Sequence, residues 1–131
     1  MNHPVNLTKQ NIAIQGYDPV SYFLGNPTAG ESSRSVTHKG AIYHFSSDDN
    51  KAMFVQDPER YSPQYGGFCA KAIAEGKLVP INPETYTITN NKLYLFYNNN
   101  GTNAKLAWDA DETAFIEKAE QQWANGELRE I

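Results

Sequence analysis

The most regular run of strand-like residues lies between residues 85 and 97. The segments TYTIT and KLYLFY, both rich in β-branched and aromatic residues, flank Asn90-Asn91. Asparagine tolerates the positive φ of a tight turn, so the pattern predicts a β-hairpin with strands at 85–89 and 92–97. The polar segment NNNGTN follows it and is expected to form a loop.

A second hairpin is predicted at residues 35–45. There the strand-like runs SVTH and AIYHF are joined by Lys39-Gly40, a separation that suits a tight turn. The preceding stretch, GNPTAGESS, is rich in Gly, Pro, Asn and Ser and has no apolar period. It is therefore expected to be a surface loop.

Capping residues mark the starts of short helices. Asp18-Pro19 places an N-cap acceptor before a proline at the first helical position, which predicts a helix from 19 to 24. Asp57-Pro58 repeats the arrangement, and the same cap chemistry predicts a further turn at 58–61.

Three longer or more apolar segments also predict helices. Two serines before an acidic first turn indicate a helix at 48–56. The segment FCAKAIAEG, after a Gly-Gly pair, predicts a short helix at 68–75. Apolar residues at i, i+4 and i+8 predict a last helix at 111–124. Helices and hairpins alternate without the spacing of a parallel sheet, so the expected fold class is α+β, with short helices and antiparallel β-hairpins.

Length, composition and charge exclude several classes of protein. The chain has 131 residues, of which 40% are hydrophobic, enough for one core. We expect an N-terminal segment at 1–11 and a single domain at 12–131. The 11 basic residues against 15 acidic ones give a net charge of −4. Because the basic residues are scattered, the sequence argues against nucleic-acid binding. No apolar run approaches the roughly 20 residues that span a bilayer.

Several motifs resemble the YHS domain, a small module linked to heavy-metal handling. They are YHFSS at 43–47, Phe54 and DPERY at 57–61, GYDPVSYF at 16–23, and YGGFCA at 65–70 with KLYL at 92–95. The last two resemble a longer, stand-alone branch whose members often carry a signal peptide. The resemblance implies a YHS-like fold from about residue 12 to Trp123. It favours an exported or periplasmic protein, whereas the N-terminus as given, which has no signal-peptide pattern, favours the cytoplasm.

The chain departs from the metal-binding branch of that family at three positions. That branch carries cysteines where this sequence has Ser21, Ser46 and Asn50. A hydroxyl or amide oxygen is a poorer ligand for a soft metal than a thiolate is, so an inherited site is expected to bind zinc or copper weakly. We interpret these three residues, with Tyr22 and Tyr65, as candidate ligand-binding residues. Core packing is the alternative role for the tyrosines.

Cys69 is the only cysteine in the chain and is predicted to lie at a helix start. Backbone N–H groups at such a place lower a thiol pKa, which makes a thiolate available as a ligand or nucleophile. A buried, inert thiol is the alternative. His44 shares a strand face with Ser46 and is the second candidate metal ligand, together with Cys69. A solvated or hydrogen-bonded side chain is its alternative.

Two other histidines are weaker candidates for metal ligands. His38 is close to a predicted turn. His3, after a free amino terminus, would complete a square-planar nitrogen set that suits Cu(II) or Ni(II). Both are more simply interpreted as surface side chains.

The sequence contains no catalytic triad order, metalloprotease motif, phosphate loop or dinucleotide fingerprint, so an enzyme is the less favoured class. The predicted function is a non-enzymatic YHS-type binding or sensing module. Its cargo is a soft metal ion, copper or zinc, or a small ligand, held in a pocket near Cys69. One alternative is a redox-active protein that uses the Cys69 thiol with an outside thiol. The other is a degenerate domain retained for protein interaction. The first hypothesis requires Ser21, Ser46, Asn50 and Cys69 to lie close together.

Overall fold

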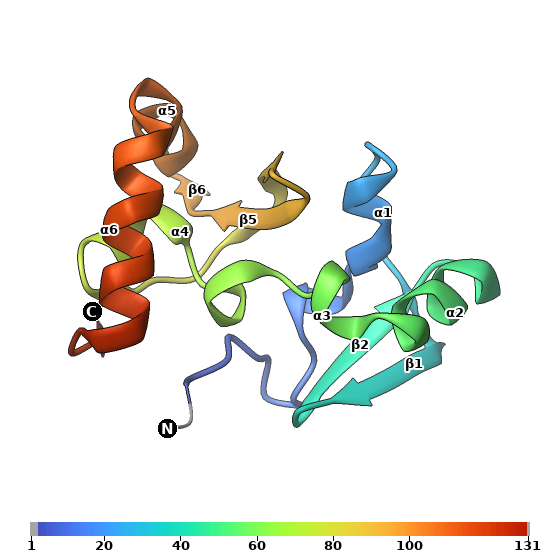
Figure 1. Cartoon of the computed structure of the whole chain (residues 1–131). Helices are drawn as coiled ribbons and strands as arrows, with labels where there is room; N and C mark the ends of the chain where they lie inside the picture. The colour runs from blue at the N-terminus through green and yellow to red at the C-terminus, as the bar shows by residue number, and fades with distance from the viewer. Residues whose placement is uncertain (1–2, 131) are drawn as a thin grey trace.

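The elements form two groups that are joined through the middle of the chain (Figure 1), as a computed structural model that describes residues 3–130 shows. The N-terminal group contains, in chain order, the 3₁₀ turn η1 (Ile14–Gly16), α1 (Pro19–Phe23), β1 (Glu31–His38), β2 (Ala41–Phe45), α2 (Asp48–Gln56) and α3 (Pro58–Tyr61). The C-terminal group contains η2 (Gln64–Gly67), α4 (Ala70–Ala74), β3 (Lys77–Leu78), β4 (Asn82–Thr89), β5 (Lys92–Phe96), β6 (Asn98–Asn99), β7 (Thr102–Asn103), α5 (Ala104–Ala110), α6 (Glu112–Asn125) and β8 (Arg129–Glu130).

Both predicted hairpins are confirmed. β1 and β2 pair antiparallel around Lys39-Gly40, and β4 and β5 pair antiparallel around Asn90-Asn91. Lys39 has a φ of 51° and Asn90 and Asn91 have φ values of 54° and 62°, as these tight turns require. The α+β fold class is confirmed as well, because the strands within residues 3–130 form two-stranded sheets beside short helices.

The N-terminal helices begin where the sequence predicts. The Asp18 side chain accepts hydrogen bonds from the first turn of α1, and the Ser47 hydroxyl accepts one from the backbone of Asn50 in α2. The expectation for Asp57 is wrong in one respect. α3 does begin after this residue, but the Asp57 side chain makes no capping hydrogen bond, since its backbone lies at φ −153°, ψ 70°.

Other differences from the sequence pattern are local. β1 begins at Glu31, inside the predicted surface loop. Its pairing with β2 changes register between Glu31 and Ser35. The expected loop after β5 contains the β6–β7 hairpin and leads into α5. α4 is shorter than predicted because Phe68 is extended. β3 and β8 pair in parallel, whereas only antiparallel pairs were expected.

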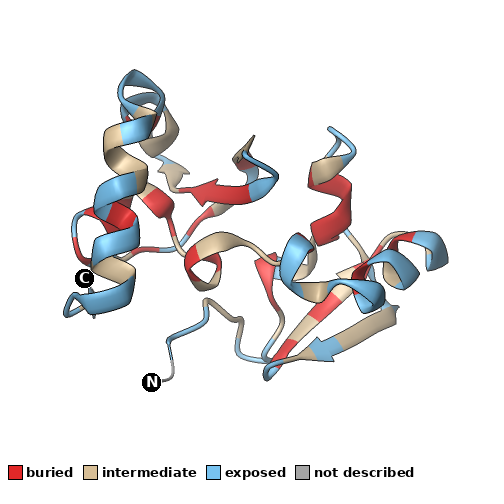
Figure 2. Cartoon of the chain, viewed as in Figure 1, coloured by how far each residue is buried: buried red, intermediate tan, exposed pale blue. Residues whose placement is uncertain are grey.

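Buried residues lie in both groups (Figure 2), and their aromatic and aliphatic side chains form the core. Phe54 of α2 packs against Tyr43 and Phe45 of β2, with ring centroids 4.8 and 5.2 Å away. In the other group Trp108 lies 5.4 Å from Tyr94. Burying one such side chain contributes about 1.5–3 kcal/mol, so these contacts hold each group together. Within residues 3–130 no helix is long and apolar enough to cross a membrane.

Candidate functional site

Three of the predicted ligand-binding residues meet at the buried carboxylate of Asp18. One carboxylate oxygen, Oδ2, accepts from the backbone N–H of Ser46 at 2.9 Å, from its hydroxyl at 2.7 Å and from Nδ2 of Asn50 at 2.8 Å. The other oxygen, Oδ1, accepts from the backbone of Val20 and Ser21. We refer to Asp18, Ser21, Ser46 and Asn50 as the Asp18 cluster.

The Asp18 cluster joins three segments of the N-terminal group. Ser21 donates from its hydroxyl to the backbone oxygen of Asp18 and accepts from the backbone of Thr28, which fixes the loop after α1. Asp18 has no exposed surface, and a buried carboxylate is tolerated only when donors replace its water. These polar side chains are therefore engaged in holding α1 against the start of α2.

Cys69 lies in a different set of contacts. Its backbone N–H donates to Val79 at 3.0 Å, and the residue pairs with Leu95 of β5. The side chain is buried, with the residue 1% exposed. Burial raises the pKa of the Cys69 thiol, and backbone donors act in the opposite direction with less effect. The expectation of a lowered thiol pKa is therefore wrong, because desolvation of the thiolate exceeds the effect of the short helix start.

His44, the other predicted metal ligand, is half-buried on β2. Its Nδ1 lies 3.4 Å from the position that a Cβ on Gly16 would take, so the imidazole rests against η1. Among the described residues, no three or more His, Cys, Asp and Glu side chains gather in a way that could hold a metal ion. The metal site based on Cys69 and His44 stays a prediction.

Tyr22 and Tyr65 have different surroundings. Tyr22 is 1% exposed, and its hydroxyl donates to the backbone oxygen of Pro83, so it links α1 to β4. Tyr65 is buried as well, but it lines a cavity of about 780 Å³. This cavity, here called the groove, is lined by His3, Pro4, Val5, His38, Lys39, Ala41, Tyr43, Glu59, Ser62, Pro63, Gln64, Tyr65, Gly66 and Trp123.

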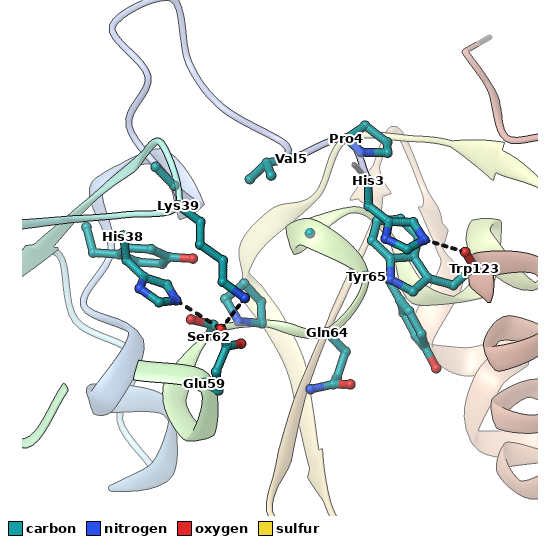
Figure 3. Close-up of a pocket in the computed structure, with 14 residues that line it drawn as sticks. His3, Pro4, Val5, His38, Lys39, Glu59, Ser62, Gln64, Tyr65 and Trp123 are labelled. Carbon is teal, nitrogen blue, oxygen red and sulfur yellow. Dashed lines mark hydrogen bonds and ion pairs between the residues drawn. The ribbon is translucent and has the colours of Figure 1, made fainter. Parts of the chain in front are cut away.

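One side of the groove is polar (Figure 3). His38 and Lys39, at the tip of the β1–β2 hairpin, converge on Glu59 of α3. His38 Nε2 lies 3.1 Å and Lys39 Nζ 2.5 Å from the same carboxylate oxygen, Oε1. The Lys39 ammonium, aided by His38, holds the pKa of Glu59 below its ordinary value. We call these three residues the polar wall.

The opposite side is aromatic (Figure 3). The His3 imidazole stacks on the Trp123 indole of α6, with centroids 4.3 Å apart and planes at 15°. The Tyr65 ring meets the Trp123 ring edge-on at 5.9 Å, and its hydroxyl donates to Glu120 at 2.8 Å. We call His3, Tyr65 and Trp123 the aromatic wall.

An unusual backbone turn brings Tyr65 and the N-terminal segment together. Tyr65, Gly66 and Gly67 all have positive φ values, of 58°, 62° and 80°. A Cβ on Gly66 would lie 2.4 Å from the backbone oxygen of Pro4, so only glycine permits this approach. Asn6 then donates from its backbone to Gly66 and from its side chain to Gly67, and the segment lies along the groove.

Of the predicted site residues, Tyr65 is the one that the structure places on the groove within residues 3–130. The sequence signal for the groove was the YGG turn, which marks positive φ but not what lies against it. His3 and His38 were weaker metal-ligand candidates with a surface role as the simpler interpretation, while Trp123 counted as an apolar position of the last helix. The predicted Cu(II) site at His3 needs residues 1 and 2, which lie outside the described residues.

Comparisons with family models, curated proteins and solved structures give no match to this chain. Membership of the YHS family stays a prediction from the sequence motifs. The function proposed below is therefore based on the geometry of the groove.

Proposed function

We propose that this protein is a non-enzymatic binding module that takes a small organic ligand, one with a planar ring and a carboxylate, into the groove. The observation that carries the proposal is the pairing of the polar wall with the aromatic wall across one cavity. The cavity volume of about 780 Å³ falls in the range of about 300–1,000 Å³ typical of small-molecule sites.

The polar wall suits a carboxylate. The side chains of Lys39 and Glu59 are 73% and 63% exposed, and exposed ion pairs contribute at most about 1 kcal/mol. A ligand carboxylate can therefore replace Glu59 as the partner of Lys39 at little cost. His38 Nε2, beside the same oxygen, offers a second donor when protonated or in the Nε2–H tautomer.

The aromatic wall suits a planar ring. Tyr65 and Trp123 present ring surface whose positions are fixed by the edge-on contact between them and by the hydrogen bond to Glu120. Rigid aromatic side chains bind rings with little loss of side-chain entropy. Binding at the groove does not involve Cys69 or the Asp18 cluster, because none of those side chains is among the residues that line it.

The test is a titration of ¹⁵N-labelled protein with indole-3-acetate, which has both a ring and a carboxylate. We expect amide shifts at Gln64, Gly66 and Lys39, and a Kd in the millimolar range or tighter, worth roughly 4 kcal/mol or more. Tryptamine, with the ring but an ammonium in place of the carboxylate, is expected to bind more weakly.

The matched variants are Lys39→Gln and Lys9→Gln. Both lysines are exposed, but Lys9 is not among the residues that line the groove. Charge-assisted hydrogen bonds are about twice as strong as neutral ones, so Lys39→Gln is expected to weaken binding about fivefold while Lys9→Gln leaves it unchanged. The proposal is overturned if no amide signal of the groove residues shifts at about 10 mM ligand. A Kd of that size would correspond to a binding free energy of only about 2.7 kcal/mol.

A further inference from the structure

His3 makes the two contacts with Trp123 that a bound ring would make. Its imidazole covers one face of the indole at 4.3 Å with nearly parallel planes. Its Nε2 lies 2.7 Å from the backbone oxygen of Trp123. A carbonyl oxygen can only accept a hydrogen bond, so Nε2 carries the proton and donates.

The acceptor is a consequence of the helix end. Trp123 lies in the last turn of α6, where backbone oxygens have no partner within the helix. Helix C-termini also carry partial negative charge, which favours an N–H donor there. The face of the Trp123 indole and the backbone oxygen of the same residue can therefore be contacted by one ring at the same time. Together they form a subsite that selects a planar ring with an N–H group.

The contact of His3 is separable from the attachment of the N-terminal segment. Asn6 fixes the segment through its two hydrogen bonds to Gly66 and Gly67, three residues further along the chain. His3 itself is exposed, and within residues 3–130 its side chain contacts Trp123 through the stack and one hydrogen bond. Its ring can leave Trp123 while the segment stays attached at Asn6.

We infer that the face of Trp123 is the ring subsite of the groove, that its ligand is a heteroaromatic carboxylate with a ring N–H, and that His3 occupies the subsite in the absence of ligand. This inference rests on the proposed function. The ring of the ligand takes the place of the imidazole and donates to the same oxygen of Trp123. The carboxylate reaches the polar wall, so His3 competes with the ligand and sets its apparent affinity.

The experiment compares wild type, His3→Ala and the control Gln10→Ala, an exposed residue of the same segment that is not among the lining residues. Each is titrated with indole-3-acetate and with 1-methylindole-3-acetate, which lacks the ring N–H, and the indole N–H signal of Trp123 is followed by NMR. Only molecules with a free subsite bind, so the apparent Kd is the intrinsic Kd divided by their fraction.

We expect His3→Ala to bind indole-3-acetate about fivefold or more tightly than wild type, which corresponds to a subsite occupied by His3 in roughly four of five molecules. Gln10→Ala is expected to match wild type, and the methylated probe is expected to bind His3→Ala more weakly than the parent probe. Equal or weaker binding by His3→Ala overturns the competition, while equal binding of both probes overturns the ring N–H requirement. In both cases binding to the groove still supports the proposed function, which fails separately if no variant binds either probe.

Discussion

Ser46 directs both its backbone N–H and its hydroxyl at one carboxylate oxygen of Asp18, at 2.9 and 2.7 Å. Two donors from one residue on one oxygen attach the strand-to-helix turn after β2 to Asp18. Asn50 adds a third donor to the same oxygen. The N-terminal group therefore depends on the negative charge and acceptor capacity of Asp18.

We predict that Asp18→Asn destabilises the protein by about 2–4 kcal/mol. An amide in this position directs its own N–H₂ group at donors whichever way it is turned, so buried donors lose their acceptor. The thermal midpoint is expected to fall by roughly 10 °C. The control is Asp49→Asn, an exposed residue in the first turn of α2, where the loss should stay below about 1 kcal/mol. Equal shifts for the two variants would contradict this role of Asp18.

A pair of glycine substitutions tests the approach of the N-terminal segment. Gly66 and Gly25 both have positive φ, at 62° and 83°. A Cβ on Gly66 meets Pro4, whereas a Cβ on Gly25 has nothing within 4 Å. Gly25→Ala is expected to cost about 1 kcal/mol for backbone strain alone, and Gly66→Ala about 1–2 kcal/mol more. Urea unfolding measures both, and a perturbed indole N–H signal of Trp123 in Gly66→Ala alone would show that the segment has moved.

The buried thiol predicts slow alkylation. Because burial raises the pKa of Cys69, the folded protein is expected to react with iodoacetamide at least about 100-fold more slowly than the urea-unfolded chain, between pH 7 and 9. The pKa of Cys69 is higher in the folded protein than in the unfolded chain, where it is about 8.5. Burial of the neutral thiol therefore adds to the free energy of unfolding below pH 8.5, and this contribution is lost as the pH rises above that value. Rapid alkylation with an apparent pKa at or below 8.5 would favour the redox alternative instead.

Metal titration with elemental analysis tests the copper or zinc alternative. We expect wild type, Cys69→Ala and His44→Ala all to retain less than about 0.1 equivalent of zinc or copper, because Cys69 is buried and, among the described residues, no three or more His, Cys, Asp and Glu side chains gather in a way that could hold a metal ion. The combined variant Ser21→Cys, Ser46→Cys, Asn50→Cys, refolded with zinc, is expected to bind about one equivalent. The Ser46 and Asn50 side chains donate to one carboxylate oxygen of Asp18, the Ser21 hydroxyl donates to the backbone oxygen of the same residue, and thiolates are strong ligands. One equivalent in wild type that is lost in Cys69→Ala would establish the metal site instead.

Local sequence signals predicted the elements that local chemistry forms. Asp18-Pro19, the serines before α2 and the Asn90-Asn91 turn act within a few residues of themselves, and each has the predicted structure. The parallel pairing of β3 with β8 joins Lys77 to Arg129. A strand of two residues is too short to show a hydrophobic period. Because these two strands lie far apart in the chain, no local pattern indicates that they pair.

The residues of the candidate site also divide into those that the sequence indicated and those that only tertiary contacts reveal. Ser21, Ser46 and Asn50 were singled out together because of a family resemblance. All three bond to Asp18, which was considered only as a helix cap. Cys69 was judged by its position before a helix, whereas burial of the side chain in the folded protein raises its pKa. Desolvation depends on tertiary packing, and no local pattern reports it.

The contact between His3 and Trp123 spans 120 positions of the sequence, and this has a kinetic consequence. Closing so long a loop costs more chain entropy than any hairpin in the fold, while the contact itself is exposed and small. It should form last when the protein folds and open first when it unfolds. The indole N–H signal of Trp123 should accordingly lose its native chemical shift at a lower urea concentration than the one at which the amide of Asn6, bonded to Gly66, loses its protection from exchange. Opening of this contact frees the face of Trp123 while the rest of the fold stays intact, so the ring subsite becomes accessible without unfolding of the chain.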